Sequence, residues 1–241
     1  MRENKFHGVI GKPEYTKGEF PRLQIIDVSH NYFTGALPSQ YMLLWDAMKA
    51  FKKVSNLKYM NVWENVTFNA LGIVSGATLY NYSTTFVMKS VATSYGKIPA
   101  NLAVIDLSSN NFSGQIPESI GSLKALYSLN LSNNALTGHI PPSLGTLTEL
   151  ESLDLSQNQL SGKIPQQLAE LIFLQKFDVS YNNLTSPIPQ QNQFHTFENT
   201  SFEGNQGLCG DPLSKKCENW LLPPSSALNK DADSNFAIEL D

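Results

Sequence analysis

The sequence predicts an α/β-type repeat solenoid, a right-handed superhelix with short parallel strands on its concave side, interrupted by an island loop. Four segments, which begin at Leu102, Leu126, Leu150 and Leu174, share one pattern at a constant spacing of 24 residues. An earlier copy begins at Leu23, and the stretch between it and Leu102 lacks the pattern. Repeats of this length indicate stacked units that bury their apolar faces only against their neighbours.

Each copy opens with a short strand. In the shared pattern LxxLxLSxNxLxGxIPxxLxxL, Ile105 and Leu107 flank Asp106, and this alternation is typical of a strand with one buried face. The same apolar pair recurs in the later copies as Leu129 with Leu131, Leu153 with Leu155, and Phe177 with Val179. Stacked about 4.8 Å apart, these strands predict a parallel sheet on the concave side.

The residues after each strand predict a turn, a bend and a return leg. An asparagine amide satisfies buried backbone groups at the turn, at Asn110, Asn134, Asn158 and Asn182. Glycine permits a sharp bend at Gly114, Gly138 and Gly162, whereas Ser186 predicts a relaxed bend in the last copy. Proline then excludes a long α-helix, at Pro117, Pro141, Pro165 and Pro189. Apolar residues close the core from the convex side, namely Ile120, Leu123, Leu144, Leu147, Leu168 and Leu171.

The loss and return of the pattern divide the chain into five predicted segments. These are partial repeats (1–49), an island (50–100), four repeats (101–189), a C-terminal cap (190–217) and an acidic, disordered, juxtamembrane-like linker (218–241). Just before the island, LLWDAMKAF predicts a short amphipathic helix with Leu44, Met48 and Phe51 on one face. The island itself is rich in Tyr, Asn, Thr, Ser and Val, which indicates an inserted loop or a small β-rich unit.

The cap carries the two cysteines of the chain, Cys209 and Cys217. They permit one disulfide, and they are too few for a structural zinc site. A solenoid has to cover its last apolar face, and a disulfide in this position would fix the covering segment.

The repeat with its GxIP element resembles the plant-type leucine-rich repeat. Five features together resemble the C-terminal ectodomain of plant receptor-like proteins of the disease-resistance class. They are the segment FPRLQIIDVSHNYFTGALPSQYMLLWDAMK, the island, four repeats after it, the cap GNQGLCGDPLSKKC, and the acidic tail. The resemblance covers roughly residues 4–220.

This resemblance implies a kinase-lacking protein on the extracellular side of the plasma membrane. It implies that upstream repeats and the island perceive a peptide or protein ligand, and that the last four repeats contact co-receptor kinases. In that family a signal peptide and many repeats precede this part, and a transmembrane helix follows it. The chain shows no apolar leader and no run of about 20 apolar residues, so we expect a fragment or a truncated product.

No pattern in the sequence indicates catalysis or a cofactor. The net charge of −4 carries no basic stretch, which argues against nucleic-acid binding. Asp106, Asp154 and Asp178 share one strand position, and we interpret them as part of the repeat, hydrogen-bonded along the sheet, because no helper group accompanies them. The histidines fall in unrelated repeat positions and form neither a metal set nor a triad: His7, His30, His139 and His195.

The concave strand positions are small and polar, and we expect them to be exposed. They are Val104, Asp106, Ser108, Ser128, Asn130, Ser132, Ser152, Asp154, Ser156, Lys176, Asp178 and Ser180. Interface hot spots favour Trp, Tyr and Arg, so this strip is a weak candidate apart from Lys176 and Asp178. Better candidates lie in the island, at Tyr80, Tyr82, Phe86 and Tyr95, unless these rings pack against the solenoid.

Six Asn-x-Ser/Thr acceptors predict surface positions in a secreted glycoprotein. We take Asn65, Asn81, Asn111, Asn183 and Asn199 as candidates. Asn130 lies on a predicted concave strand, where a glycan would obstruct binding, and is the weakest of the six.

Two other functions stay open from the sequence. One is a soluble apoplastic enzyme inhibitor resembling polygalacturonase-inhibiting proteins, against which the island and the acidic tail argue. The other is a truncated, non-functional receptor fragment, because a solenoid that starts near Leu23 exposes an apolar edge.

Overall fold

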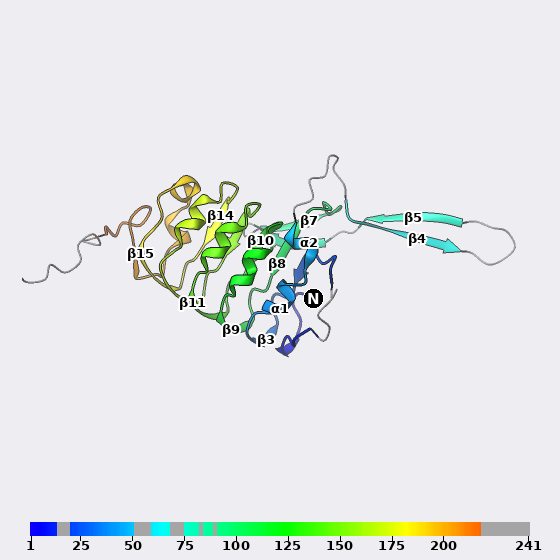
Figure 1. Cartoon of the computed structure of the whole chain (residues 1–241), viewed down its shortest axis with the longest axis horizontal. Helices are drawn as coiled ribbons and strands as arrows, with labels where there is room; N and C mark the ends of the chain where they lie inside the picture. Colours follow the sequence, from blue (N-terminus) through cyan, green and yellow to red (C-terminus); the bar gives the residue numbers. More distant parts are fainter. Residues whose placement is uncertain (14–19, 51–58, 68–74, 82–83, 89–90, 218–241) are drawn as a thin grey trace, which may run out of the picture.

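The computed structural model describes residues 1–13, 20–50, 59–67, 75–81, 84–88 and 91–217, with the side chains of residues 61–93 outside that description. Successive repeats stack side by side into a curved solenoid (Figure 1). Parallel strands line two of its sides, and short helices line a third. The predicted repeat solenoid is therefore confirmed.

The concave sheet has five parallel strands in the order β14-β12-β10-β8-β2. They are β2 (Ile25–Asp27), β8 (Ala103–Asp106), β10 (Leu126–Asn130), β12 (Ser152–Asp154) and β14 (Lys176–Asp178). Equivalent residues of neighbouring repeats lie opposite one another, as Asp154 and Asp178 do. Strand β2 pairs directly with β8 although the island separates them in sequence. The solenoid is therefore continuous across the insertion.

A second sheet, the lateral sheet, contains seven parallel strands in the order β1-β3-β9-β11-β13-β15-β16. They are β1 (His7–Val9), β3 (Tyr32–Gly35), β9 (Asn111–Gln115), β11 (Ala135–His139), β13 (Gln159–Gly162), β15 (Asn183–Pro187) and β16 (Gly207–Cys209). Strand β1 was not predicted. The stretch from Asn4 to Ile10 follows the NxFxGxI part of the repeat, and this short signal precedes the first complete copy.

Short 3-10 helices form the convex side of the regular repeats. They are η1 (Glu118–Ser122), η2 (Pro142–Thr146) and η3 (Gln166–Glu170). Each follows or includes the repeat proline, which holds an extended conformation before the helix, as Pro117 does at φ −74° and ψ 141°. The predicted convex residues Ile120, Leu144 and Leu168 are fully buried in the common core.

A ladder of asparagines joins adjacent repeats. In Asn134, the amide Nδ2 donates to the carbonyls of Leu131 and Ser132 in its own repeat and of Leu107 in the preceding one, each at 3.1 Å. Its Oδ1 accepts the backbone N–H of Phe112 at 3.0 Å. The structure extends the four predicted ladder residues at both ends, with Asn31 and Asn205. Buried backbone groups at every turn are thereby satisfied by side chains.

The prediction of a relaxed bend at Ser186 is wrong. Ser186 has φ +79°, the value that Gly114 and Gly138 adopt within a degree. The bend persists because β15 still pairs on its other side with β16, where Ser186 lies opposite Leu208. Pairing with the cap thus holds a serine in a left-handed conformation that ordinarily favours glycine.

The short amphipathic helix predicted in LLWDAMKAF, residues 43–51, is present but shorter than the segment. Among the described residues of this segment only α2 (Asp46–Lys49) is helical, and another one-turn helix, α1 (Ser39–Met42), precedes the segment. The backbone leaves the helical pattern because it pairs elsewhere: Ala47 N–H donates to Pro21 O, and Met48 O accepts from Ala125 N–H. Met48 is buried as expected, but its buried partners are Met42 and Trp45; Leu44 is half-buried and Phe51 lies outside the described residues.

The island region contains two antiparallel hairpins. Strand β4 (Asn61–Thr67) pairs with β5 (Ser75–Asn81), and β6 (Thr84–Met88) pairs with β7 (Val91–Tyr95). The β4–β5 hairpin projects beyond the end of the solenoid (Figure 1). This region is the only described part of the chain whose strands pair antiparallel within sheets, which separates it from the repeats.

The cap covers the last apolar face of the solenoid. Phe177 of the last repeat is fully buried, and its ring centre lies 4.9 Å from Phe194, 5.6 Å from Phe197 and 5.9 Å from Phe202. These rings come from η4 (Asn192–Thr196), η5 (Asn199–Ser201) and their flanks. Cys209 and Cys217 form a disulfide beyond them. The predicted linker 218–241 lies outside the described residues.

The opposite end of the described solenoid is apolar and open. A hollow of about 490 Å³ lies against β2 and is lined mainly by apolar side chains, among them Ile10, Phe20, Leu23, Tyr41 and Trp45. Phe20 is 61% exposed at its margin. This apolar edge is the feature that the sequence predicted at the start of the repeats.

Candidate binding surfaces

The expectation that the concave strip is exposed is wrong for most of its residues. Val104, Asp106 and Ser128 are each at most 2% exposed, and Ser108, Ser152, Ser156 and Ser180 are at most 7% exposed. Val104 is buried because Ile98, Leu102, Met60, Tyr95 and Tyr127 pack in one cluster with it. The hydroxyls of Ser108, Ser156 and Ser180 each donate to the aspartate two residues earlier, so these side chains lie against their own strand.

The strand acids act as hydrogen-bond acceptors for the next turn. Asp154 Oδ1 accepts the backbone N–H of Ser156 at 3.0 Å and its hydroxyl at 2.7 Å. Asn130 makes the same pair of bonds with Ser132. The bonds therefore stay within each repeat, which corrects the expectation that they run along the sheet. The interpretation of these acids as part of the repeat stands, because Oδ1 of each aspartate accepts hydrogen bonds from the turn that follows its own strand.

Burial raises the pKa of the Asp106 and Asp154 carboxyls above their usual value. The hydrogen bonds from Ser108 and Ser156 oppose that shift, because they favour the charged form. Neutral Asn130 occupies the same position between them and keeps the same bonds. The position thus requires an acceptor oxygen and does not require a charge.

Tyr95 joins the island to the concave face. It is half-buried and packs with Tyr127 of β10 in the cluster around Val104. The interpretation that island rings pack against the solenoid therefore applies to Tyr95. Tyr80, Tyr82 and Phe86 have side chains outside the described residues, and their binding role stays a prediction.

Tyr127 was missed by the sequence analysis. It occupies the first outward strand position, one place before the residues that were considered. The pKa of its phenol is raised, first by burial and then by the nearby Glu151 and Glu149 carboxylates. An aromatic ring with two acids beside it is a better recognition element than the small polar strip.

Lys176 and Asp178 form an ion pair at the C-terminal end of the concave sheet. Nζ of Lys176 lies 3.5 Å from Oδ2 of Asp178, and the two side chains are 30% and 19% exposed. The pair presents no strong net charge, because each partner neutralises the other. Its role in binding stays a prediction.

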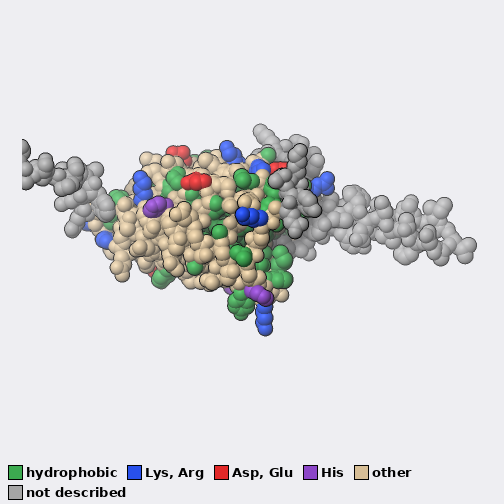
Figure 2. All heavy atoms as spheres, turned by 60° about the horizontal axis from the view of Figure 1, so that its bottom comes forward, with side chains coloured by type: hydrophobic (Ala, Val, Ile, Leu, Met, Phe, Trp, Pro, Cys, Tyr) green, Lys and Arg blue, Asp and Glu red, His purple; other side chains and the backbone are tan. Residues whose placement is uncertain are grey.

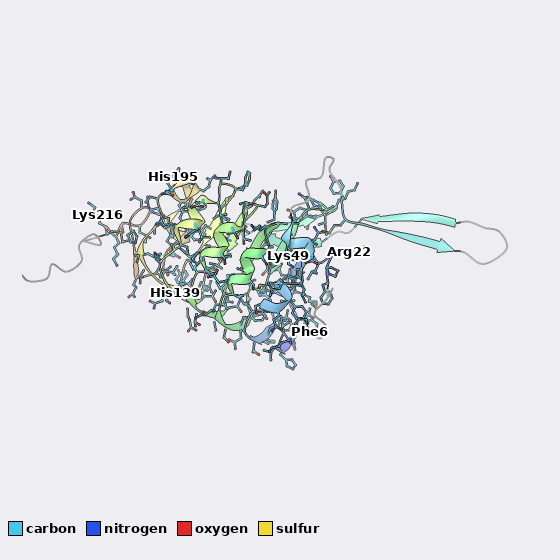
Figure 3. The ribbon with its side chains drawn as sticks, in the orientation of Figure 1. Phe6, Arg22, Lys49, His139, His195 and Lys216 are labelled. Atoms are coloured by element: carbon cyan, nitrogen blue, oxygen red, sulfur yellow. A yellow bond between two sulfur atoms is a disulfide. The ribbon has the colours of Figure 1, made fainter. Side chains whose placement is uncertain are left out.

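Within the described residues, no group of three or more His, Cys, Asp and Glu side chains is arranged to hold a metal ion. Figure 3 shows His139 and His195 at opposite margins of the solenoid. The ring of His139 is within hydrogen-bond distance of the Ser161 carbonyl, with Nδ1 at 3.0 Å, so it serves the contact between two repeats.

The predicted glycosylation acceptors differ in their surroundings. Asn111 and Asn183 are exposed at the start of equivalent strands of the lateral sheet, and Asn199 is exposed in the cap. Asn130 is half-buried and engaged by Ser132. The side chains of Asn65 and Asn81 lie outside the described residues. Use of any of these acceptors stays a prediction.

The side turned forward in Figure 2 consists mostly of uncharged atoms with scattered charged side chains. This agrees with a chain in which only 16% of residues are charged. No helix within the described part of the chain has both the length and the apolar character that crossing a membrane requires.

Comparison with known proteins agrees with this architecture. The family described as Leucine rich repeat matches residues 100–160 and 125–184, and a related Leucine Rich Repeat family matches residues 22–42. Receptor like protein 27 of Arabidopsis thaliana is 54% identical over 93% of this chain, and Receptor-like protein 34 of the same plant is 52% identical over 93%. The chain spans 26% and 22% of the length of these two relatives.

Among solved structures, the ectodomain of the Arabidopsis receptor kinase HAESA, in complex with an IDA peptide hormone, matches 89% of this chain and 30% of its own chain. The sequence identity is 28% and the TM-score is 0.51. The chain is therefore built of leucine-rich repeats, and its fold is similar to that of a plant receptor ectodomain. It is homologous over most of its length to the plant receptor-like proteins.

Proposed function

We propose that the chain is the ligand- and co-receptor-binding extracellular part of a kinase-lacking plant cell-surface receptor-like protein that acts in defence or developmental signalling. The observation that carries the proposal is the identity of 54% with a receptor-like protein over 93% of the chain. The proposal also places the chain on the extracellular side of the plasma membrane.

The geometry supports binding by surface complementarity. The asparagine ladder and two continuous sheets hold neighbouring repeats in fixed register, so side chains on different repeats keep constant spacing. A preformed surface loses little conformational freedom on association. The acids that a catalytic role would need are occupied by hydrogen bonds to serines. We therefore assign this chain a binding role and no reaction.

The proposed partners are a peptide or protein ligand and a co-receptor kinase. The ligand would contact the island and repeats that precede it. The co-receptor would contact the last four repeats, where Lys176 and Asp178 lie on β14 at the edge of the concave sheet and Tyr127 lies on its central strand, β10.

The experiment uses the full chain, secreted from a eukaryotic host, and the purified ectodomain of SERK2, the partner of BIR3 in a solved complex. We expect saturable binding in biolayer interferometry. Lys176→Ala should weaken it, and Lys163→Ala, which alters an exposed lysine on the lateral side, should leave it unchanged. Absence of saturable binding by the unaltered chain would contradict the co-receptor part of the proposal.

A further inference from the structure

Large exposed apolar side chains form two groups in the described residues. One group lies in the N-terminal part of the chain, and of its members Met1 and Phe20 line the open hollow: Met1, Phe6, Val9, Phe20, Tyr32 and Leu43. The other lies in the last full repeat, where Ile172 is 58% exposed and Phe173 is 50% exposed, with Tyr181 further along. Tyr181 donates its hydroxyl to Glu203, so it has a partner within the fold.

The turn Ile172–Phe173 departs from the repeat pattern. It connects η3 to β14, and the same two places hold Lys124 and Ala125 in one repeat and Thr148 and Glu149 in the next. Polar or small residues are thus sufficient for the turn. Two large apolar side chains here are not needed for stacking, because Leu171 and Leu174 on either side already fill the core at 2% and 1% exposure.

The turn is held in place by the cap. Gln193 of η4 donates its side-chain amide to the Ile172 carbonyl at 2.7 Å. The next residues join the neighbouring repeat, since Gln175 and Lys176 both donate their backbone N–H to Glu151 O, at 2.8 and 3.1 Å. The apolar pair is therefore presented on a fixed backbone, which lowers the entropy lost when a partner binds.

Acidic residues lie near this turn in its own repeat and in the preceding repeat. Glu149 occupies the place of Phe173 in the neighbouring repeat, and Glu151 is joined to the strand that follows the turn. Glu170 ends η3 two residues before Ile172 and is exposed. The nearest lysine on the strand, Lys176, is paired with Asp178. An apolar centre with an acidic margin is complementary to an apolar pocket flanked by Lys or Arg.

We propose that the Ile172–Phe173 turn is the apolar anchor by which this chain docks a co-receptor ectodomain that presents an apolar pocket flanked by basic side chains. The inference rests on the proposed function and names the contact within it. Tyr127, with Glu149 and Glu151 beside it, extends the same surface toward the island through Tyr95.

The test compares matched variants of the full chain for binding to the SERK2 ectodomain by biolayer interferometry. Ile172→Ser with Phe173→Ser should weaken binding by about tenfold or more, as removal of a central apolar anchor does. Glu149→Lys with Glu170→Lys should also weaken binding, and the loss of affinity should be larger at low salt than at high salt, because salt screens charges. Tyr32→Ser, at a ring that is 62% exposed on the N-terminal side, should leave the affinity unchanged. Circular dichroism checks that each variant keeps its fold.

The outcomes separate the two proposals. If the unaltered chain binds and the Ile172/Phe173 variant binds equally well, the anchor is refuted while the co-receptor role stands. If the unaltered chain does not bind, the co-receptor role fails and the anchor fails with it. Equal loss of binding in the Tyr32→Ser control would also refute a specific anchor at this turn.

Discussion

One end of the described solenoid is covered by a cap, and the other end is open. At the C-terminal end, three cap phenylalanines, a ladder asparagine and a disulfide cover the last repeat. At the N-terminal end, a partial repeat contributes one strand, and an apolar hollow of about 490 Å³ stays open. Exposed apolar residues beside the hollow have the chemistry of a stacking face. Ile172 and Phe173 are exposed apolar residues beside the closed end, so their exposure needs another explanation.

The largest expected effect is the loss of the aromatic closure. Phe177→Ala removes a fully buried ring that contacts three cap phenylalanines and should lower the free energy of unfolding by about 3–5 kcal/mol. Phe20→Ala, at the open end, should cost well below that because Phe20 is 61% exposed. Urea titrations followed by circular dichroism measure both. Equal losses in the free energy of unfolding would contradict the difference between the two ends.

The ladder asparagines at the two ends provide the next comparison. Asn205→Ala leaves the Leu184 N–H without its partner, removes one of the two amide donors to the Val179 carbonyl, and should cost about 1–3 kcal/mol. Asn31→Ala should cost less, because its partners Phe6 and Met1 lie in an exposed terminal segment. Denaturant midpoints of the two variants give the comparison, and a larger loss for Asn31→Ala would contradict it.

The disulfide should matter for the cap alone. Replacing Cys209 and Cys217 by serine opens a loop with a sequence separation of 8 and should cost about 2–3 kcal/mol by the chain-entropy estimate. Limited proteolysis followed by mass spectrometry should then show earlier cleavage in residues 190–217, with the cleavage pattern near Leu23 unchanged. Earlier cleavage both in residues 190–217 and near Leu23 would show that the solenoid unfolds as a single unit.

The smallest expected effect comes from a central repeat. Burial holds the pKa of Asp154 in the folded chain above its unfolded value of 3.8. Between the unfolded and the folded pKa the folded chain therefore binds more protons than the unfolded chain, and its stability falls as the pH rises through that interval. Asp154→Asn keeps the acceptor, as Asn130 does, and should raise stability slightly at pH 7. Thermal melts at pH 4 and pH 7 should show a weaker pH dependence for the variant. An unchanged dependence would contradict the assignment.

Periodicity was sufficient to predict the repeats, because each ladder, bend and core position recurs with the same neighbours. It failed where a residue's state depends on a distant segment. Val104 is buried by island residues, Ser186 keeps its bend through β16, and α2 is shortened by pairing with Pro21 and Ala125. Ile172 and Phe173 were visible as departures from the repeat, but their exposure depends on how the cap and Leu171 pack.

Hydrogen exchange with and without the SERK2 ectodomain tests the account most directly. Bound partner should add protection at residues 146–151 and 170–176, around the apolar turn and its acidic margin, and should leave residues 20–48 at the open end unchanged. Added protection confined to the open hollow, with none at the Ile172–Phe173 turn, would contradict the account.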